Sequence, residues 1–363
     1  MTRVVIKPAW ILSSESGDRF EPQLFRLLRA IHDTGKLTLA AKAVSLSYRH
    51  AWDLLGRWAE TFGSELVSLE RGRGARLTPL GEKLLWAEQR TEAGLFPHLQ
   101  NVATELNAAI RKARERPTHV LRIHASHGYA IEKIPSLARE HGAGEVDLKY
   151  VGSVEALASL RRGTCDLAGF HVPLGDLAPE LWTPYAPWFN RRQQKIIRMV
   201  IRTQGLIVAR GNPLRLRRIK DLAKAGVRFV NRQAGSGTRI LLDGLLRSAR
   251  VDPARIAGYD TGEFTHGAVA AFVASGIADV ALGIEPAARQ FNLDFVPVAR
   301  ERYMLTCRTS SLAQPAVAAL CALLAGPQYR AAMASVPGYE PDQPGLVVDA
   351  ESVFPWLVAE RRS

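Results

Sequence analysis

The sequence predicts an α/β protein with an N-terminal α+β winged helix-turn-helix and a C-terminal domain of two lobes. Three observations favour this fold class. In the first 78 residues, two short helical segments joined by a tight turn precede a hairpin pattern. From residue 118 onward, short β-branched runs alternate with helical runs, as in parallel α/β layers. The loops that join them fall into two clusters along the chain, which predicts two lobes with a ligand cleft between them.

Composition and charge limit the classes of protein that fit. The 363 residues are 47% hydrophobic, enough for two or three domains with cores. The formal net charge of +13 favours a polyanionic partner, with nucleic acid first and a membrane surface second. Three cysteines without a paired spacing argue against a disulfide scaffold or a structural zinc site. No secretory signal or apolar run of transmembrane length occurs, so we expect a cytoplasmic protein with no membrane partner.

Three helical patterns occupy the chain up to residue 62. Pro22 is placed to open the first helix and Gly35 to end it. An alanine-rich segment at 38–44 and an amphipathic segment at 48–62 follow, joined by a short Ser-Leu-Ser turn. The small residues of the former allow the latter to pack closely. This arrangement is typical of a helix-turn-helix whose second helix enters the major groove of DNA.

The pattern of a wing follows. Two short strand-like segments flank a Gly-Arg-Gly tip at 72–74, where arginines are placed to contact phosphates or the minor groove. The start of the second helix can reach phosphates or base edges, although a solvated helix end would show the same residue types. The predicted DNA-contacting residues are Thr38, Ser47, Tyr48, Arg49, His50, Arg71, Arg73 and Arg76.

Residues 37–85 resemble the winged helix-turn-helix of the ModE-type molybdate-responsive regulators and, more distantly, that of the LysR type. The segment 47–53, Ser-Tyr-Arg-His-Ala-Trp-Asp, is similar to the opening of the ModE recognition helix, with Arg49 in place of lysine. The segment 77–81, Leu-Thr-Pro-Leu-Gly, is similar to the step after the wing in both families. The resemblance implies a DNA-binding transcriptional regulator.

A long helix is expected from Pro79 to Arg116, broken or kinked near Pro97. Its apolar seam could pair with a second copy of the chain, in a homodimer or higher homo-oligomer on palindromic double-stranded DNA, or pack on the chain's own second domain. We therefore divide the chain into a winged helix-turn-helix at 1–78, a dimerisation and linker helix at 79–117, and a sensor domain at 118–363 with its second lobe at roughly 203–298. The seam consists of Leu95, Leu99, Val102, Leu106 and Ile110, at alternating spacings of four and three.

The most informative loop of the sensor domain is the turn at 231–239. It follows a β-branched run, contains Gly-Ser-Gly and passes directly into an apolar helical run at 240–246. The first N–H groups of such a helix attract anions, and Arg239 adds a planar guanidinium that fits an oxyanion. Helix capping by the serine alone would also explain the pattern. Together with the other strand-to-helix loops, the predicted ligand-binding residues are Ser126, His127, Ser153, His171, Ser236, Gly237, Thr238, Arg239, Thr265, His266 and Tyr303.

Three of these residues are histidines, and their separations of 44 and 95 residues match no metal-ligand pattern. They can hydrogen-bond a ligand or respond to pH. The sequence contains no nucleophile elbow, phosphate-binding Walker loop, dinucleotide fingerprint or HExxH zinc motif. We therefore expect no catalytic residues, no bound metal and no cofactor, and a protein that is not an enzyme.

Residues 119–310 resemble the periplasmic-binding-protein-like domain that is fused inside bacterial regulators and molybdopterin-related proteins, a cytoplasmic relative of the molybdate and tungstate binding proteins. The resemblance implies a type II Venus-flytrap domain with a small oxyanion as ligand. One departure concerns ligand identity: the family usually has Gly-Ser-His-Asp in the first loop, and this chain has Ala-Ser-His-Gly at 125–128. The residues that carry the resemblance are Gly205 and the segments 163–171, 211–213, 231–239, 265–269, 283–285 and 301–303.

Two hypotheses of different classes follow. The first is a DNA-binding transcriptional regulator whose cleft senses an oxyanion, with molybdate or tungstate first and, in a LysR-like variant, a small organic anion. The second is a cytoplasmic protein that binds or delivers molybdate or a molybdenum-cofactor precursor, in which the winged helix mainly dimerises. The wing arginines and the high net charge favour the first.

Overall fold

The computed structural model describes residues 3–11, 21–70, 74–114 and 120–359. The chain divides into two compact units whose boundary lies between Leu95 and Phe96. The smaller unit begins at Lys7 and ends at Leu95. The larger unit comprises the chain from Phe96 onward together with the N-terminal residues up to Ile6.

The smaller unit contains three helices and a hairpin, as the sequence predicts. Helices α1 (Pro22–Thr34), α2 (Leu37–Ala43) and α3 (Tyr48–Phe62) bury one apolar face each. Gly35 and Gly63 end α1 and α3 in the left-handed conformation, with φ of 64° and 63°, where a side chain would be strained. Strands β1 (Val67–Glu70) and β2 (Gly74–Leu77) pair in antiparallel fashion. The core is made by residues such as Leu24, Leu27, Leu28, Ile31, Leu54 and Leu66, which are fully buried.

Helix α4 (Pro79–Ala113) contributes to both units. It runs through Pro97 without interruption, so the expected break does not occur. Proline removes one backbone hydrogen bond at a cost of about 3 kcal/mol, which the packing of a helix this long can offset. Its predicted apolar seam stays on the surface of the chain, because Leu95, Val102 and Leu106 are 41%, 53% and 42% exposed.

The second half of α4 uses polar side chains to cover the edge of a sheet. Strand β4 (Glu145–Tyr150) is the outermost strand on that side. Asn101 Nδ2 donates to the Tyr150 carbonyl (2.8 Å), the Tyr150 N–H donates to Asn101 Oδ1 (2.7 Å), and Thr104 Oγ1 donates to the Leu148 carbonyl (3.1 Å). These bonds satisfy backbone groups that an edge strand otherwise leaves open.

The larger unit is built on one mixed sheet of ten strands, with the order β4-β3-β5-β10-β6-β9-β7-β8 and with β11 and β12 paired to β6. Neighbouring strands are parallel within the first lobe (β4-β3-β5) and within the second (β9-β7-β8). The remaining strands are β3 (Val120–Ala125), β5 (Leu167–Pro173), β6 (Gln194–Val208), β7 (Phe229–Arg232), β8 (Gly262–Glu263), β9 (Val280–Ile284), β10 (Asp294–Arg308), β11 (Tyr339–Pro341) and β12 (Val347–Val348).

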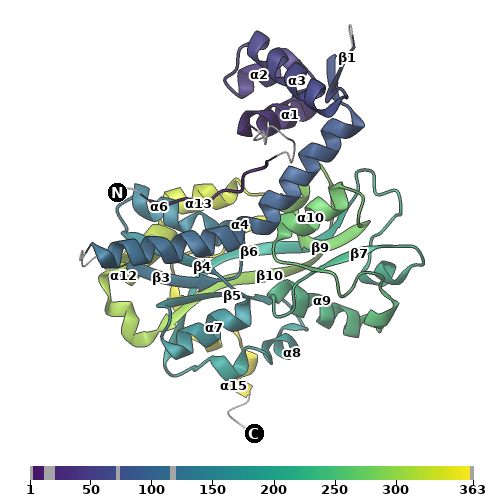
Figure 1. Cartoon of the computed structure of the whole chain (residues 1–363). Helices are drawn as coiled ribbons and strands as arrows, with labels where there is room; N and C mark the ends of the chain where they lie inside the picture. Colours follow the sequence, from purple (N-terminus) through teal and green to yellow (C-terminus); the bar gives the residue numbers. More distant parts are fainter. Residues whose placement is uncertain (1–2, 12–20, 71–73, 115–119, 360–363) are drawn as a thin grey trace. The chain divides into compact units, whose positions relative to one another are not determined.

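Two long strands join the lobes. β6 and β10 have 15 residues each and lie side by side, antiparallel, over their whole length (Figure 1). β6 runs from the first lobe into the second and β10 returns from the second to the first, which confirms the prediction of two lobes. The apolar runs at 199–201 and 205–209, however, suggest two shorter segments in place of β6. The reason is that β6 carries polar residues near its centre, where the lobes meet.

Helices cover both lobes. α7 (Ser153–Arg162) and α8 (Ala178–Trp182) pack in the first lobe, and α9 (Gly237–Ser248) and α10 (His266–Ala274) in the second (Figure 1). Two short helices follow β3, and Pro135 lies at the start of the second. No helix in the described ranges is long and apolar enough to span a membrane. The other helices are α5 (Tyr129–Glu132), α6 (Ile134–Glu140), α11 (Glu285–Gln290), α12 (Pro315–Ala325), α13 (Pro327–Ala334), α14 (Ala350–Val353) and α15 (Trp356–Ala359).

Candidate functional site

The turn after β7 brings the two lobes into contact. Ser236 is the N-cap of α9, and its Oγ accepts a hydrogen bond from the Arg239 N–H (3.2 Å). Gly237 begins the helix directly beneath the imidazole ring of His171, which extends from β5 of the first lobe. A Cβ atom at Gly237 would lie 2.3 to 2.8 Å from three atoms of that ring, so only glycine fits. The predicted turn therefore meets a predicted histidine of the opposite lobe.

A fully buried carboxylate, Glu301 on β10, lies at the centre of this contact. Its Oε2 is 2.7 Å from His171 Nδ1. Its Oε1 accepts from Arg202 Nε (2.6 Å) and from Gln204 Nε2 (2.8 Å). Gln204 Nε2 is also 3.1 Å from the hydroxyl of Thr238 on α9. Arg202 and Gln204 share one face of β6 because alternate residues of a strand point the same way, and Arg202 is the cross-strand partner of Glu301.

A second buried guanidinium completes the cluster. Arg232, the last residue of β7, is 3% exposed and donates to the carbonyls of Phe264 (Nη2, 2.7 Å) and Glu263 (Nε, 3.3 Å). Within the described residues, Arg232 Nη1 and Arg202 Nη2 have no hydrogen-bond partner although both are buried. Burial, and then the charge of Arg202, lowers the pKa of Arg232. The charged form of this arginine therefore lacks a counter-anion.

Glu301 and the surrounding histidines fix the net charge of the cluster. Burial raises the pKa of Glu301, but its contacts with His171 and Arg202 and the hydrogen bonds that it accepts lower the pKa further, so the carboxylate is ionised. Burial lowers the pKa of His171, against the opposing charge of Glu301, and His171 as a neutral ring donates its Nδ1 hydrogen to that carboxylate. Burial and the two arginines lower the pKa of His127 to about 3 and that of His266 well below its usual value. The positive charges of Arg202 and Arg232 thus face the single negative charge of Glu301.

We expect the stability of the unliganded protein to fall as pH is lowered. The histidines have folded-state pKa values below the unfolded value of 6.5, so the unfolded chain binds more protons below that pH. Each contributes a slope of up to about 1.4 kcal/mol per pH unit between its two pKa values. Urea unfolding at pH 7, 6 and 5 measures this slope, and His266→Gln should flatten it. An unfolding free energy that stays level down to pH 5 would contradict the neutral state assigned to these rings.

The structure gathers most of the predicted ligand residues around the cluster. Tyr303 stacks on His171, with ring centroids 5.8 Å apart, and its hydroxyl donates to the Ser126 carbonyl (2.7 Å). Thr265 is the N-cap of α10 and accepts from the Ala268 N–H (2.8 Å). Buried side chains from both lobes lie at the starts of α7, α9 and α10, namely Ser153, Ser236, Thr238, Thr265 and His266.

The sequence predicts that the guanidinium of Arg239 binds an oxyanion, but in the structure this group already has partners in its own lobe. Its Nε is 3.1 Å from Asp243 Oδ1, its Nη1 donates to the Tyr259 carbonyl (3.2 Å), and its guanidinium stacks 3.9 Å above the Tyr259 ring. The charge of Arg239 is thus already paired on its own helix. Its role as a ligand residue stays a prediction, whereas Arg232 and Arg202 present the unpaired N–H groups.

Four polar residues of the cluster were not among the predicted site residues: Arg202, Gln204, Arg232 and Glu301. One signal could have found two of them. Arg202 and Gln204 lie on the same face of β6, at positions where strand periodicity predicts burial. No group of three His, Cys, Asp or Glu side chains suited to a metal occurs in the part of the chain that the structure describes.

A second surface of interest is the start of α3 in the smaller unit. Ser47 is its N-cap and accepts from the His50 N–H (3.1 Å). The Arg49 side chain is 93% exposed, with only Asp53 nearby at 3.9 Å. The rings of Tyr48 and Trp52 stack on the same surface, and each residue is 50% exposed. Thr38, His50 and Arg76 are also exposed, and Arg71 and Arg73 lie outside the described residues.

Residues 135–325 match the family profile of the PBP superfamily domain, which covers more than half of the chain. The chain belongs to the PBP superfamily. Residues 22–82 match a second profile, the bacterial regulatory helix-turn-helix proteins of the LysR family. A LysR-type helix-turn-helix followed by a PBP superfamily domain makes this chain a DNA-binding transcriptional regulator with a ligand-binding domain, and not an enzyme.

Individual relatives cover parts of the chain. Uncharacterized protein YvgK of Bacillus subtilis is 33% identical over 204 residues, 55% of this chain and 64% of YvgK. The molybdenum-pterin-binding protein MopB of Rhodobacter capsulatus is 35% identical over 101 residues, 27% of this chain and 37% of MopB. The match thus spans less than two thirds of either relative. Among solved structures, a cysteine-to-serine mutant of OxyR from Corynebacterium glutamicum has a TM-score of 0.43 at 19% identity, over 84% of this chain and 92% of that one.

Proposed function

We propose that this regulator senses a small oxyanion in the contact between its two lobes, with molybdate or tungstate as the effector. The observation that carries the proposal is the excess positive charge of the buried cluster. Arg202 and Arg232 place two charges beside the single carboxylate of Glu301, and each guanidinium keeps an unpaired N–H group. An anion with hydrogen-bond-accepting oxygens would supply both the missing charge and the missing acceptors.

The helix starts around the cluster favour the same class of ligand. α9 and α10 begin at Gly237 and His266, and both bring backbone N–H groups and the positive end of a helix dipole to the contact. The hydroxyl of Thr238 and the neutral imidazole of His266 add donors that carry no charge. Donors from several elements that converge on one buried contact suit a compact tetrahedral oxyanion.

Molybdate and tungstate come first among oxyanions for two reasons. Residues 37–85 resemble ModE-type regulators, and the relative MopB is named as a molybdenum-pterin-binding protein. The match covers 37% of MopB, so it supports the class of ligand and leaves the individual anion to experiment.

Calorimetric titration of the full chain tests the effector. We expect molybdate or tungstate to bind with one site per chain, and sulfate and phosphate to bind more weakly. Binding of a small carboxylate such as benzoate in place of all four would favour the organic-anion alternative. If no tetrahedral oxyanion binds, the assignment of the cluster is wrong.

The alternative of a binding or delivery protein makes a different prediction for DNA. The observation that supports this alternative is that the relative MopB is named as a molybdenum-pterin-binding protein. For the regulator, we expect a discrete footprint on palindromic DNA and an affinity that falls steeply with salt, because contacts to phosphates release counterions. A delivery protein would bind molybdate but protect no discrete site.

We further propose that the regulator binds DNA as a homodimer and that ligand acts by favouring the closed lobes. The exposed seam of α4 at Leu95, Val102 and Leu106 is the apolar surface on which a second copy would pack. A ligand can shift the open and closed states only by its difference in affinity for them. Sedimentation of the full chain and of a Val102→Glu, Leu106→Glu variant measures the dimer, and a variant that stays dimeric would exclude this seam.

A further inference from the structure

A second concentration of arginines lies far from the buried cluster, at the outer ends of β6 and β10. There, the structure contains a pocket of about 740 Å³. Gln194 at the start of β6 lines it, and Arg308 at the end of β10 is the cross-strand partner of Gln194. Arg202 follows Gln194 by eight residues, which is about 26 Å along an extended strand. The pocket is therefore a different site from the cluster between the lobes.

Backbone carbonyls, and not carboxylates, hold the guanidinium groups of this pocket. Arg308 Nη2 donates to the carbonyls of Leu160 and Arg161, at 3.2 Å each, at the end of α7. Arg161 in turn donates to the Pro187 carbonyl, and Arg191 donates to the Leu357 carbonyl. A carbonyl fixes the position of a guanidinium but leaves its charge uncompensated.

The absence of acidic partners distinguishes these arginines from many others of the same unit. Among the residues that the structure describes, no Asp or Glu lines the pocket, and none of its four arginines forms an ion pair. Elsewhere in the same unit arginines are neutralised, for example Arg122 by Asp166 and Arg228 by Asp279, each at 2.7 Å. The four arginines of the pocket are Arg161, Arg191, Arg192 and Arg308.

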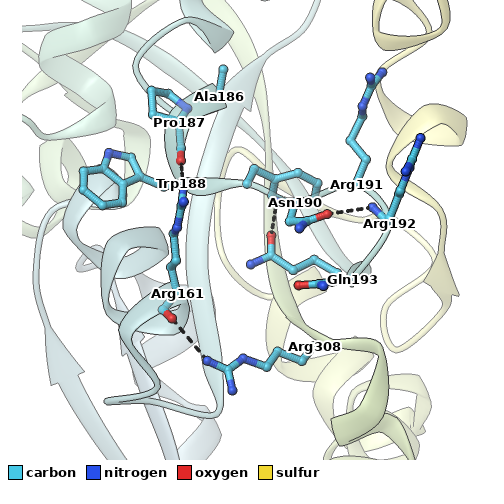
Figure 2. Close-up of a pocket in the computed structure, with 11 residues that line it drawn as sticks. Arg161, Ala186, Pro187, Trp188, Asn190, Arg191, Arg192, Gln193 and Arg308 are labelled. Atoms are coloured by element: carbon cyan, nitrogen blue, oxygen red, sulfur yellow. Dashed lines mark hydrogen bonds between the residues drawn. The ribbon is translucent and has the colours of Figure 1, made fainter. Parts of the chain in front are cut away.

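A rigid turn separates the arginines into two pairs. Figure 2 shows Arg161 and Arg308 on one side of Asn190, and the side chains of Arg191 and Arg192 extending on the other. Asn190 holds the turn, because its Oδ1 accepts from the Arg192 N–H (3.1 Å) and its N–H donates to Gln194 Oε1 (3.0 Å). The backbone of the turn is thus held, and Arg161, Arg191 and Arg308 are positioned by the carbonyls to which they donate, which lowers the entropic cost of binding.

We propose that this pocket binds a small phosphorylated molecule with at least two anionic groups. Its volume lies within the range of about 300 to 1,000 Å³ that small-molecule sites occupy. Guanidinium groups match the oxygens of phosphate in geometry and charge, and two separated pairs fit a ligand whose charges are also separated. A concave pocket favours such a ligand over the convex backbone of duplex DNA.

Titration of the full chain with ATP, pyrophosphate, AMP and inorganic phosphate tests the proposal. We expect ATP or pyrophosphate to bind more tightly than inorganic phosphate. Arg192→Glu should weaken that binding at least about tenfold, since it removes charge-assisted hydrogen bonds and adds repulsion. The Arg192 side chain is exposed and forms no ion pair within the described residues, so the fold should tolerate the change. Arg308→Gln, which keeps a donor for the α7 carbonyls, should weaken binding as well.

Two controls separate this site from others. Arg217→Glu makes the same change of charge at an exposed position in the second lobe and should leave the binding of ATP unchanged. Arg232→Ala, in the buried cluster, should also leave it unchanged, so failure of the oxyanion proposal would be visible separately. The pocket proposal is overturned if none of the four probes binds or if Arg192→Glu binds them as well as the parent. It is also overturned if Arg192→Glu weakens only the binding of duplex DNA, which would make this surface a nucleic-acid contact.

Discussion

Replacing Arg232 with alanine is expected to reduce oxyanion affinity by roughly 10- to 150-fold while the protein remains folded. A hydrogen bond to a charged group contributes about 1.5 to 3 kcal/mol, and the buried Arg232 would offer both a charge and a free N–H group. The folded state should tolerate the loss, because the same side chain is a buried charge without an anionic partner of its own. Calorimetric titration with molybdate and tungstate measures the affinity, and thermal unfolding measures the stability.

The stability of the unliganded variant makes the test specific. If Arg232 serves the ligand, Arg232→Ala loses the ligand-induced rise in Tm but keeps most of the Tm of the free protein. If Arg232 is only structural, the Tm of the free protein falls and ligand binding survives in the remaining folded fraction. Arg239→Ala is the informative comparison, because that guanidinium is paired with Asp243 and should matter much less. Equal losses in the two variants would contradict the site assigned here.

Arg49→Ala is expected to weaken operator binding by about 1 to 3 kcal/mol, or roughly 5- to 150-fold. Arg49 lies in the first turn of α3 and is 93% exposed, as a residue that contacts DNA must be in the free protein. Its ion pair with Asp53 is long at 3.9 Å and solvent-exposed, so giving it up for DNA costs little. Fluorescence anisotropy with a labelled operator, measured at several salt concentrations, gives the affinity and its salt dependence.

The salt dependence shows what Arg49 contacts. A contact to phosphate would weaken binding to all sequences and reduce the slope of log affinity against log salt by about one, whereas a contact to a base edge would relax specificity at one position. Arg26→Ala on α1 removes the same charge from an exposed position outside the helix-turn-helix and serves as the control. Equal affinity for the operator in Arg49→Ala and the parent would exclude α3 as the reading helix.

Local sequence signals predict the smaller unit almost completely. The boundaries of α1 and α3 follow from Pro22, Gly35 and Ser47, each of which acts through its own backbone or capping chemistry. β6 is different, because the pattern suggests two segments where the structure has one strand. Arg202 and Gln204 interrupt the burial pattern of the strand because both contact Glu301 in the buried cluster. A polar residue where strand periodicity predicts burial is thus the sequence signal of that cluster.

The remaining parts of the site depend on tertiary contacts that no local pattern contains. The pairing of Arg239 with Asp243 and Tyr259 is visible only once α9 and the following loop are placed. Likewise, the meeting of Gly237 with the ring of His171 joins residues of different lobes. The residue types at these loops can be predicted from sequence. Which arginine is paired and which keeps unpaired N–H groups is seen only in the structure.

The second half of α4 contacts both lobes of the larger unit. Asn101 ties the helix to the first lobe through two hydrogen bonds to Tyr150, while the ring of His98 lies 5.0 Å from that of Phe264 in the second lobe. The carbonyl of Phe264 in turn holds Arg232. One helix thus contacts both lobes, so we expect a change in the separation of the lobes to strain or break one of these two contacts.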